Sequence, residues 1–313
     1  MIAFVLKRLG FAVVTCFAVL TLVFFAIRIL PGDPALVILG DQASAASIAA
    51  LRSKLGLDQP VLLQYIHFVS GVPSGDWGTS IASGRPVIQE ILGVLPSTIE
   101  LTVASLIVGI VLGVPAGVWS AVHRNRIPDY LTRILSLLGL SAPAFVSGVI
   151  LLLVFSVQLQ WLPVISSGGT GTLGDRAINL VLPSINLGLI MAAYITRVTR
   201  SAMLEVLGQD YIRTAKAKGL SSRVVIYRHG FRNCLIPVVT VVGLYFGILL
   251  GNSVLTEIVF SRPGLGKLIV GALSQRDYPM LQGMIVIYTL IVVTVNLVTD
   301  LSYGFIDPRV KNK

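Results

Sequence analysis

The sequence predicts an all-α membrane protein with six transmembrane helices. Hydrophobic residues make up 55% of the 313 residues, charged residues only 12%, and the mean hydropathy is +0.87. Such values lie outside the range of soluble domains. The apolar residues gather in long continuous runs, whereas the strands of a membrane barrel alternate in short segments. A spanning helix needs about 20 apolar residues, and six runs approach that length: residues 9–30, 98–121, 134–157, 181–195, 235–260 and 281–306.

The first run follows Lys7 and Arg8 and so resembles a signal peptide. Its apolar stretch is too long for one, and no small-x-small cleavage site follows, so we expect a retained membrane anchor. The fourth run is the weakest, because it is short and is interrupted by Pro183. Cys16 lies in the first span and Cys234 at a membrane edge, so a disulfide between them is not expected.

Three parts are predicted along the chain. Residues 1–30 form an N-terminal tail and membrane anchor, residues 31–97 an extracytoplasmic loop, and residues 98–313 a transmembrane core. The loop is too long for a simple connector and too short for an independent domain, so we expect it to pack on the membrane portion. Two short helices are predicted in it. One is capped by Ser47 and ends at Leu55 before Gly56, and the other begins at Pro60.

The basic residues predict the orientation of the chain, because loops rich in Lys and Arg stay in the cytoplasm. An even number of spans then places both termini in the cytoplasm. The net charge of +10 is concentrated on this face, which argues against nucleic-acid binding, since no soluble basic domain is present. The most basic loop covers residues 197–234, where only Glu205 and Asp210 oppose Arg197, Arg200, Arg213, Lys216, Lys218, Arg223, Arg228 and Arg232.

Within this loop, a short amphipathic helix is predicted from Tyr211 to Lys218. Asp210 is its expected cap and Gly219 its expected left-handed stop. Three-and-four spacing would place Tyr211, Thr214, Ala215 and Lys218 on one face. Two interpretations stay open for this basic helix: it docks in a groove of another protein, or it lies on anionic lipid head groups.

Two stripes of glycine predict close helix packing. In the second span Gly109, Gly113 and Gly117 recur every fourth residue, and in the fifth span Gly243, Gly247 and Gly251 do the same. Bare stripes of this kind let helix backbones approach closely. They indicate either fixed packing within one bundle or an interface that moves or joins a second membrane chain.

Charged residues within the spans are few and lie near the ends of the apolar runs: Arg28, Glu100, Glu257 and Asp300. We interpret them as interfacial charges rather than substrate ligands. Carriers driven by protons or sodium usually hold carboxylates or broken helices near the midplane, so ion coupling is disfavoured.

Catalytic and metal-binding patterns are missing from the sequence. His67, His123 and His229 stand on different loops without metal-ligand spacing, and no nucleophile elbow occurs. The segment Gly264-Leu265-Gly266-Lys267 lacks the Ser or Thr and the second spaced glycine of a phosphate loop. The sequence therefore predicts no enzyme and no bound cofactor or metal, and any driven transport needs another subunit to supply the energy.

Several segments together resemble the peptide and nickel permease family of binding-protein-dependent ABC importers, in the branch of the first dipeptide or oligopeptide permease subunit. The resemblance covers nearly the whole chain. It rests on these segments in this order: Ile29-Leu30-Pro31-Gly32-Asp33-Pro34, Leu55-Gly56-Leu57-Asp58 with Gln64-Tyr65, Gly75-Asp76-Trp77-Gly78, Glu205-Val206-Leu207-Gly208, Asp210-Tyr211-Ile212-Arg213-Thr214-Ala215, Arg232-Asn233, Ser261-Arg262-Pro263-Gly264-Leu265-Gly266, Arg276-Asp277-Tyr278-Pro279 and Asp307-Pro308-Arg309.

The family's cytoplasmic signature is Glu-Ala-Ala followed by Gly and later by Ile-x-Leu-Pro. Here the first positions read Arg213-Thr214-Ala215 with Gly219, and the later ones read His229-Gly230-Phe231-Arg232. The Glu and the final Pro are therefore absent, and Arg213 does not inherit the contact that a Glu would make.

The resemblance implies a type I ABC importer permease in a bacterial inner membrane. Its expected partners are a second similar permease, two ATPases that bind ATP and Mg²⁺, and an extracytoplasmic binding protein. Di- or oligopeptides are the expected substrates, although nickel chelates, glutathione, opines and sugars also occur in the family. The short helix would be the ATPase-coupling helix, with Asp210, Tyr211, Arg213, Thr214, Ala215, Lys216, Lys218 and Gly219, and the binding protein would dock near Asp76, Trp77 and Arg85.

Two alternatives from other classes remain at this point. A membrane receptor or scaffold would use the basic loop to bind lipid or a signalling partner without transport. An intramembrane enzyme would need catalytic residues that the sequence does not offer.

Overall fold

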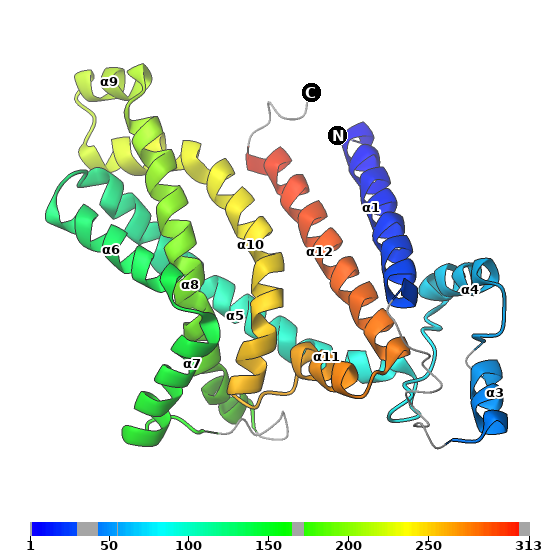
Figure 1. The fold of residues 1–313 in the computed structure, drawn as a ribbon. Helices are drawn as coiled ribbons and strands as arrows, with labels where there is room; N and C mark the ends of the chain where they lie inside the picture. The colour runs from blue at the N-terminus through cyan, green and yellow to red at the C-terminus, as the bar shows by residue number, and fades with distance from the viewer. Residues whose placement is uncertain (1, 30–42, 55, 165–171, 307–313) are drawn as a thin grey trace. The chain divides into compact units, whose positions relative to one another are not determined.

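The computed structural model describes residues 2–29, 43–54, 56–164 and 172–306. These ranges are mainly helical; they contain no β-strand and one isolated bridge between Thr79 and Pro86. Within these ranges five helices are long and apolar enough to cross a membrane, and a bent pair of helices makes six if it is counted as one span. The helices (Figure 1) are α1 (Ile2–Ile29), α3 (Ala45–Lys54), α4 (Val61–Ser74), α5 (Val87–Val122), α6 (Ile127–Ser141), α7 (Ala144–Leu152) with the π-helical segment η1 (Leu153–Gln158), α8 (Leu173–Leu207), α9 (Asp210–Ala217), the π-helical segment η2 (Val224–Phe231), α10 (Arg232–Val259), α11 (Leu265–Ser274) and α12 (Tyr278–Ile306).

The chain forms two compact units. The first contains the described residues of 97–263 and 295–306, and so holds α6 to α10 with the later part of α5 and the end of α12. The second contains residues 2–96 and 264–294, and so holds α1, α3, α4, α11 and most of α12.

The third predicted span is two helices rather than one. Its halves, Ile127–Ser141 and Ala144–Gln158, are bent by 99°. Pro143 explains the break, because a residue before proline is pushed out of the helical region, and Ala142 is extended with φ −88° and ψ 127°. The prediction of one continuous helix over residues 134–157 is therefore wrong.

The fourth span, predicted to be short and broken at Pro183, is the long helix α8. The hydropathy of this region is lowered by polar side chains that the helix buries rather than exposes to lipid. Asn186 donates to the Ala144 carbonyl of α7 at 2.9 Å and accepts from Ser147 Oγ at 2.7 Å. Thr196 Oγ1 donates to the Gly113 carbonyl of α5 at 3.2 Å. Because polar groups in a membrane must be paired internally, these partners let a polar sequence form a spanning helix.

Two predicted boundaries also differ from those in the structure. The second span begins at Val87 and continues through Pro96, rather than starting at residue 98. The predicted basic loop over residues 197–234 is mostly helix, since α8 runs to Leu207 and η2 begins at Val224. Arg197 and Arg200 therefore belong to α8, and only residues 208–223 separate the two long helical segments.

In the second unit, α3 and α4 occupy the region of the two predicted short helices. The hydroxyl of Ser44, and not that of Ser47, accepts the first-turn N–H: Ser47 N donates to Ser44 Oγ at 3.1 Å. Gly56 follows with φ +64°, and α4 begins after Pro60. The buried carboxylate of Asp277 accepts hydrogen bonds from Ser80 and from the Ala82 N–H, which holds the turn before α5 against the α11–α12 connection.

The glycine stripe of α5 lies against α8. A Cβ at Gly109 would be 2.5 Å from Met191 Cγ, one at Gly113 would be 2.8 Å from Ile195 Cβ, and one at Gly117 would be 2.6 Å from Thr199 Cβ. Real Cβ atoms do not approach so closely, so the two backbones are as near as glycine permits. This contact within the chain favours fixed packing for the first stripe.

The three glycines of the α10 stripe differ in how closely other parts of the chain approach them. A side chain at Gly243 would overlap Thr299, Gly247 is half-buried, and Gly251 is exposed. No described atom lies within 4 Å of the Cβ position at Gly251. The C-terminal end of this stripe, at Gly251, therefore leaves room for a packing partner from outside the described residues.

The glycine contact predicts an asymmetric response to alanine along α5. Gly113→Ala should lower the free energy of unfolding by about 1–3 kcal/mol, because the added methyl forces α5 and α8 apart. Gly93→Ala is the control: it lies on the same helix with nothing within 4 Å of its Cβ position, and alanine there should be neutral or stabilising. Thermal unfolding of the purified protein in detergent checks both variants. Equal melting temperatures for the two would contradict the close packing.

Candidate functional site

The short basic helix α9 follows the end of α8 (Figure 1). Gln209, in an extended conformation, precedes its first residue, so Asp210 lies in the first turn rather than at the predicted cap position. Gly219 has φ +77° and its N–H donates to the Lys216 carbonyl at 3.0 Å. Left-handed backbone is least costly for glycine, which explains why the helix ends there.

One face of α9 is buried against its own chain. Ile212 and Ala215 form a small apolar cluster with Val225 of η2, and Leu207 packs against it. Ala215 is only 7% exposed. The predicted face is therefore divided: Ala215 fits α9 closely onto η2, whereas Tyr211, Thr214 and Lys218 are exposed.

The other face of α9 is exposed. Tyr211 Oη accepts a hydrogen bond from Asn233 Nδ2 at 3.0 Å, and Asn233 also donates to the His229 carbonyl at 2.8 Å. The bond to Tyr211 ties α9 to the start of α10. Asp210 and Arg213 contact each other at 3.5 Å, and both are well exposed, so the pair adds little stability. The remaining predicted coupling residues are also exposed: Thr214, Lys216, Lys218 and Gly219.

Exposed cations also follow this helix in the sequence. Besides those of α9, the side chains of Arg223, Arg228 and Arg232 are exposed. α9 is therefore fixed by the apolar cluster with Val225 on one face and presents positive charge on its exposed face. Such a surface suits an anionic groove or an anionic membrane surface.

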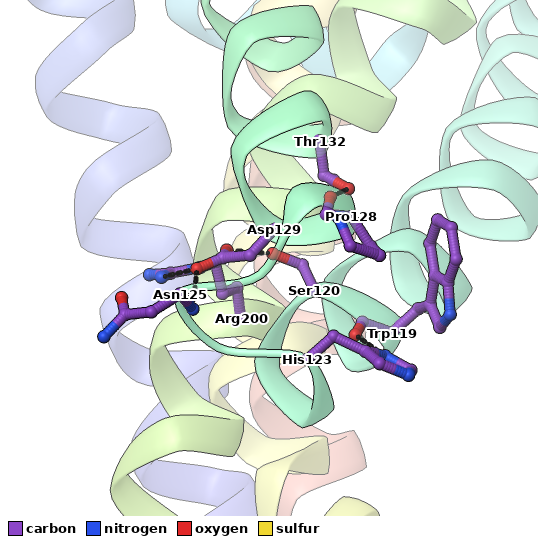
Figure 2. Close-up of polar contacts among 8 residues, drawn as sticks. All are labelled: Trp119, Ser120, His123, Asn125, Pro128, Asp129, Thr132 and Arg200. Carbon is purple, nitrogen blue, oxygen red and sulfur yellow. Dashed lines mark hydrogen bonds and ion pairs between the residues drawn. The ribbon is translucent and has the colours of Figure 1, made fainter.

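A buried ion pair lies where α5, α6 and α8 meet (Figure 2). Asp129, in the first turn of α6, is fully buried, and its carboxylate accepts from Arg200 Nε at 2.6 Å and Arg200 Nη2 at 2.8 Å. Ser120 Oγ of α5 donates to the same carboxylate at 2.6 Å, and the Asn125 N–H donates at 3.0 Å. Asn125 has φ +60°, so the carboxylate also holds a left-handed turn.

Sequence reasoning missed this site. Arg200 was assigned to the basic loop, with Glu205 and Asp210 as its opposing charges, whereas it lies in α8 and pairs with Asp129 across 71 positions. No short motif joins Ser120, Asp129 and Arg200. The available signal was an acidic residue directly after Pro128, in the first turn of a helix.

A second buried polar group lies at the C-terminal end of α10. Glu257 is fully buried and accepts from Thr98 Oγ1 at 2.6 Å, so its interpretation as an interfacial charge is wrong. Arg262 Nη2 contacts Glu100 Oε2 at 3.0 Å. Burial lowers the pKa of the Arg262 guanidinium from its usual value, and Glu100 opposes that shift.

The candidate docking residues of the second unit differ in exposure. Asp76 and Arg85 are exposed, whereas Trp77 is half-buried and packs against the core around Val87 and Met284. The Trp77 indole N–H donates to the Val72 carbonyl at 3.2 Å. Trp77 is therefore mainly a packing residue of its own unit. Among the described residues no group of three or more His, Cys, Asp or Glu side chains is placed to hold a metal ion.

These features define a class of protein: an α-helical membrane protein with several spans and a short, well-supported amphipathic helix outside them. Its fold is similar to that of solved inward-facing structures of the MetNI methionine ABC transporter. One such chain matches with a TM-score of 0.55 at 18% identity, over 70% of this chain and 97% of that chain.

The chain belongs to the family of binding-protein-dependent transport system inner membrane components. The family model matches residues 113–312, and the model of the family's N-terminal part matches residues 1–102. The chain is 44% identical to the glutathione transport system permease protein GsiC of Escherichia coli K12 and to that of Salmonella typhimurium LT2, over 100% of each protein.

The chain is thus a permease subunit of a binding-protein-dependent ABC importer and a multi-pass inner-membrane protein. It is not itself an enzyme, because the ATPase of such importers is a separate subunit. The alternative of a receptor or scaffold without transport is not favoured.

Because one face of α9 is buried, glutamate should have different effects at Ala215 and at Ala217. Ala215→Glu should displace α9 from η2, because an unpaired charge is costly in an apolar contact. Trypsin cleavage after Arg213, Lys216 and Lys218 should accelerate by about ten-fold for each 1.4 kcal/mol lost, since cleavage follows the population of the opened form.

Ala217→Glu is the matched control, because Ala217 is exposed on the same helix. It should keep the parent rate of cleavage after Arg213, a site that residue 217 does not adjoin. Limited proteolysis of the purified protein measures both rates. Cleavage of Ala215→Glu at the rate of Ala217→Glu would show that the Ala215 contact does not hold α9 in place.

Proposed function

We propose that this chain forms half of a translocation path with a second, similar permease, and that α9 is the helix by which it receives movement from a cytoplasmic ATPase. The observation that carries the proposal is the construction of α9. A helix of eight residues stands outside the candidate spans with its apolar face fixed to η2 and its basic face exposed. Two ATPases, with ATP and Mg²⁺, and an extracytoplasmic binding protein complete the importer.

The exposed side chains of α9 are the proposed contacts with the ATPase. Tyr211, Arg213, Thr214, Lys216 and Lys218 present both hydrogen-bonding groups and positive charge. Ala215 serves the same function indirectly, by seating the helix. A groove lined with carboxylates would match this surface, and complementary charge favours fast and specific association.

The proposed orientation places both termini, the α5–α6 turn and α9 in the cytoplasm. The distribution of basic residues supports it: Arg124 and Arg126 precede α6, and the cations around α9 lie on the neighbouring connection. The region of residues 31–97 would then face the binding protein, with Asp76 and Arg85 as its exposed candidates.

Small peptides are the proposed substrates, with glutathione as the first to test. The full-length similarity to glutathione transport permeases supports this choice. Glutathione is itself a short peptide, so one path could serve both glutathione and dipeptides. The binding protein would make most of the selection before the substrate reaches the membrane.

The mechanism follows from the stiffness of long helices. ATP binding closes the ATPase dimer and carries α9 with its groove. Because α9 is fixed to η2 and to the start of α10, this displacement passes into α8 and α10, which tilt and open the path toward the binding protein. Hydrolysis of ATP reverses the movement.

Charge reversal on the exposed face of α9 should separate this chain from its ATPase. Arg213→Glu with Lys216→Glu is expected to reduce the ATPase that co-purifies with the tagged chain by about ten-fold or more, because like charges then face each other. Arg124→Glu with Arg126→Glu is the control, with the same charge change on exposed residues of the α5–α6 turn. The measurement is quantitative co-purification with ATP hydrolysis.

The same experiment tests the transport function. The unaltered chain should recover a second permease and ATPase, with hydrolysis stimulated by the binding protein and glutathione. Recovery of this chain alone, under conditions that preserve a control importer, would instead support a receptor. Undiminished ATPase recovery with the Arg213 and Lys216 variant would remove α9 from the contact.

Orientation is tested by single cysteines on a background in which Cys16 and Cys234 are replaced. Arg85→Cys should react with a membrane-impermeant maleimide in intact cells with the outer membrane permeabilised, and Arg213→Cys should react only after the inner membrane is opened. Labelling measured by a mass shift on a gel checks this. The reverse pattern would contradict the proposed topology.

A further inference from the structure

The ion pair between Asp129 and Arg200 joins three helical segments at one point. Asp129 lies in the first turn of α6, Ser120 in the last turn of α5, and Arg200 in α8 (Figure 2). Four hydrogen bonds reach one carboxylate, from Ser120, from the Asn125 N–H and, twice, from Arg200. We call these residues the three-helix clamp.

The construction of the three-helix clamp favours a geometric role over a purely stabilising one. Asp129 has no exposed surface, and the Arg200 guanidinium contacts it through two nitrogens. Removing two charges from water costs much of what their attraction returns, so a buried ion pair is weak evidence for added stability. A planar, two-pronged contact does, however, fix the orientation of its two partners.

The position of the clamp links it to α9. Arg200 lies about two turns of helix before Leu207, where α8 ends. Next to the clamp, α5 and α8 are already packed closely together. The contacts are those of Gly113 with Ile195 and of Gly117 with Thr199. The clamp adds the α5–α6 turn and the start of α6 to this closely packed pair.

We propose that Asp129, Arg200 and Ser120 are positioning residues for transport: they make the α5–α6 turn move as one body with α8. This inference rests on the proposed role of α9 as the ATPase contact. Displacement of α9 then passes through the last two turns of α8 and the clamp into α5 and α6 together. Without the clamp, α8 would move while the α5–α6 turn lagged behind.

The first readout is the number of ATP molecules hydrolysed for each substrate molecule transported. The complete importer with its binding protein is reconstituted in proteoliposomes, with radiolabelled glutathione as the probe. Asp129→Asn keeps the shape of the side chain but removes the ion pair, and it should raise this ratio by about five-fold or more. Asp175→Asn is the matched control, and the ratio should not change. Asp175 is also a carboxylate of α8 that accepts hydrogen bonds, but these come from Thr172 at the helix start.

A double variant separates positioning from stability. Asp129→Asn with Arg200→Gln leaves no unpaired buried charge, so the complex should assemble even if Asp129→Asn alone does not. The proposal expects a raised ratio in the double variant as well. Full recovery of the parent ratio would show that the clamp serves only to neutralise buried charge and would overturn the proposal.

Ser120→Ala gives a third variant that changes no charge. It removes one of the four hydrogen bonds and should assemble normally, with a smaller rise in the ratio than Asp129→Asn. An unchanged ratio in both Ser120→Ala and the double variant would also overturn the proposal.

The second readout needs no substrate. Spin labels are placed at the exposed positions Arg124, on the α5–α6 turn, and Glu205, near the end of α8, in a chain without Cys16 and Cys234. Their distance should be the same with and without ATP in the parent complex, and should differ between the two states in the double variant. A parent distance that changes, or a double variant whose distance does not, would refute movement as one body.

These outcomes are distinguishable from failure of the proposed function. If no ATPase assembles with the parent chain, the role of α9 fails. If the parent hydrolyses ATP and the complex changes conformation, but the clamp variants behave like Asp175→Asn, only the clamp proposal fails.

Discussion

The structure depends on one constraint: a helix that crosses a membrane must find partners for its polar groups within the protein. α8 meets this constraint at three points along its length. Its Asn186 bonds to α7, its Thr196 to the backbone of α5, and its Arg200 to Asp129 at the start of α6. Because each bond leads to a different helix, α8 becomes the member around which the first unit is arranged. The helix with the most polar side chains is therefore the most buried, and its C-terminal end is the place from which α9 projects.

Much of the fold could be predicted from composition and run length, because burial in lipid imposes a simple rule on apolar stretches. The rule failed where helices pack on protein instead of lipid. α8 was expected to be short because Pro183 and several polar residues lower its hydropathy, yet those polar residues have partners. The bend before α7 was missed although Pro143 marks it, since hydropathy averages over a single proline. Turn chemistry was more reliable: Gly56 and Gly219 both adopt positive φ at the ends of short helices.

The candidate site was predictable in place but not in detail. A basic segment between two apolar runs located α9 correctly, whereas its spacing alone could not tell which face is covered. Ala215 was placed on one face with Tyr211, Thr214 and Lys218, but it is buried on Val225 while the other three are exposed. The partner of Arg200 was beyond reach, because Asp129 is distant in sequence and belongs to no short motif. Contacts between distant segments depend on how helices pack, which local pattern does not encode.

The contact between α5 and α8 has a consequence for how this sequence can vary. Glycine on α5 stands opposite a larger residue on α8 at three successive levels, with Met191, Ile195 and Thr199 as the larger members. The relation reverses at Gly188 of α8, which meets Val108 of α5. What the interface fixes is therefore the summed volume of each facing pair rather than the identity of either residue. Substitutions across it should be inherited as compensating pairs, so that co-variation in size among related chains would trace this seam without any structure.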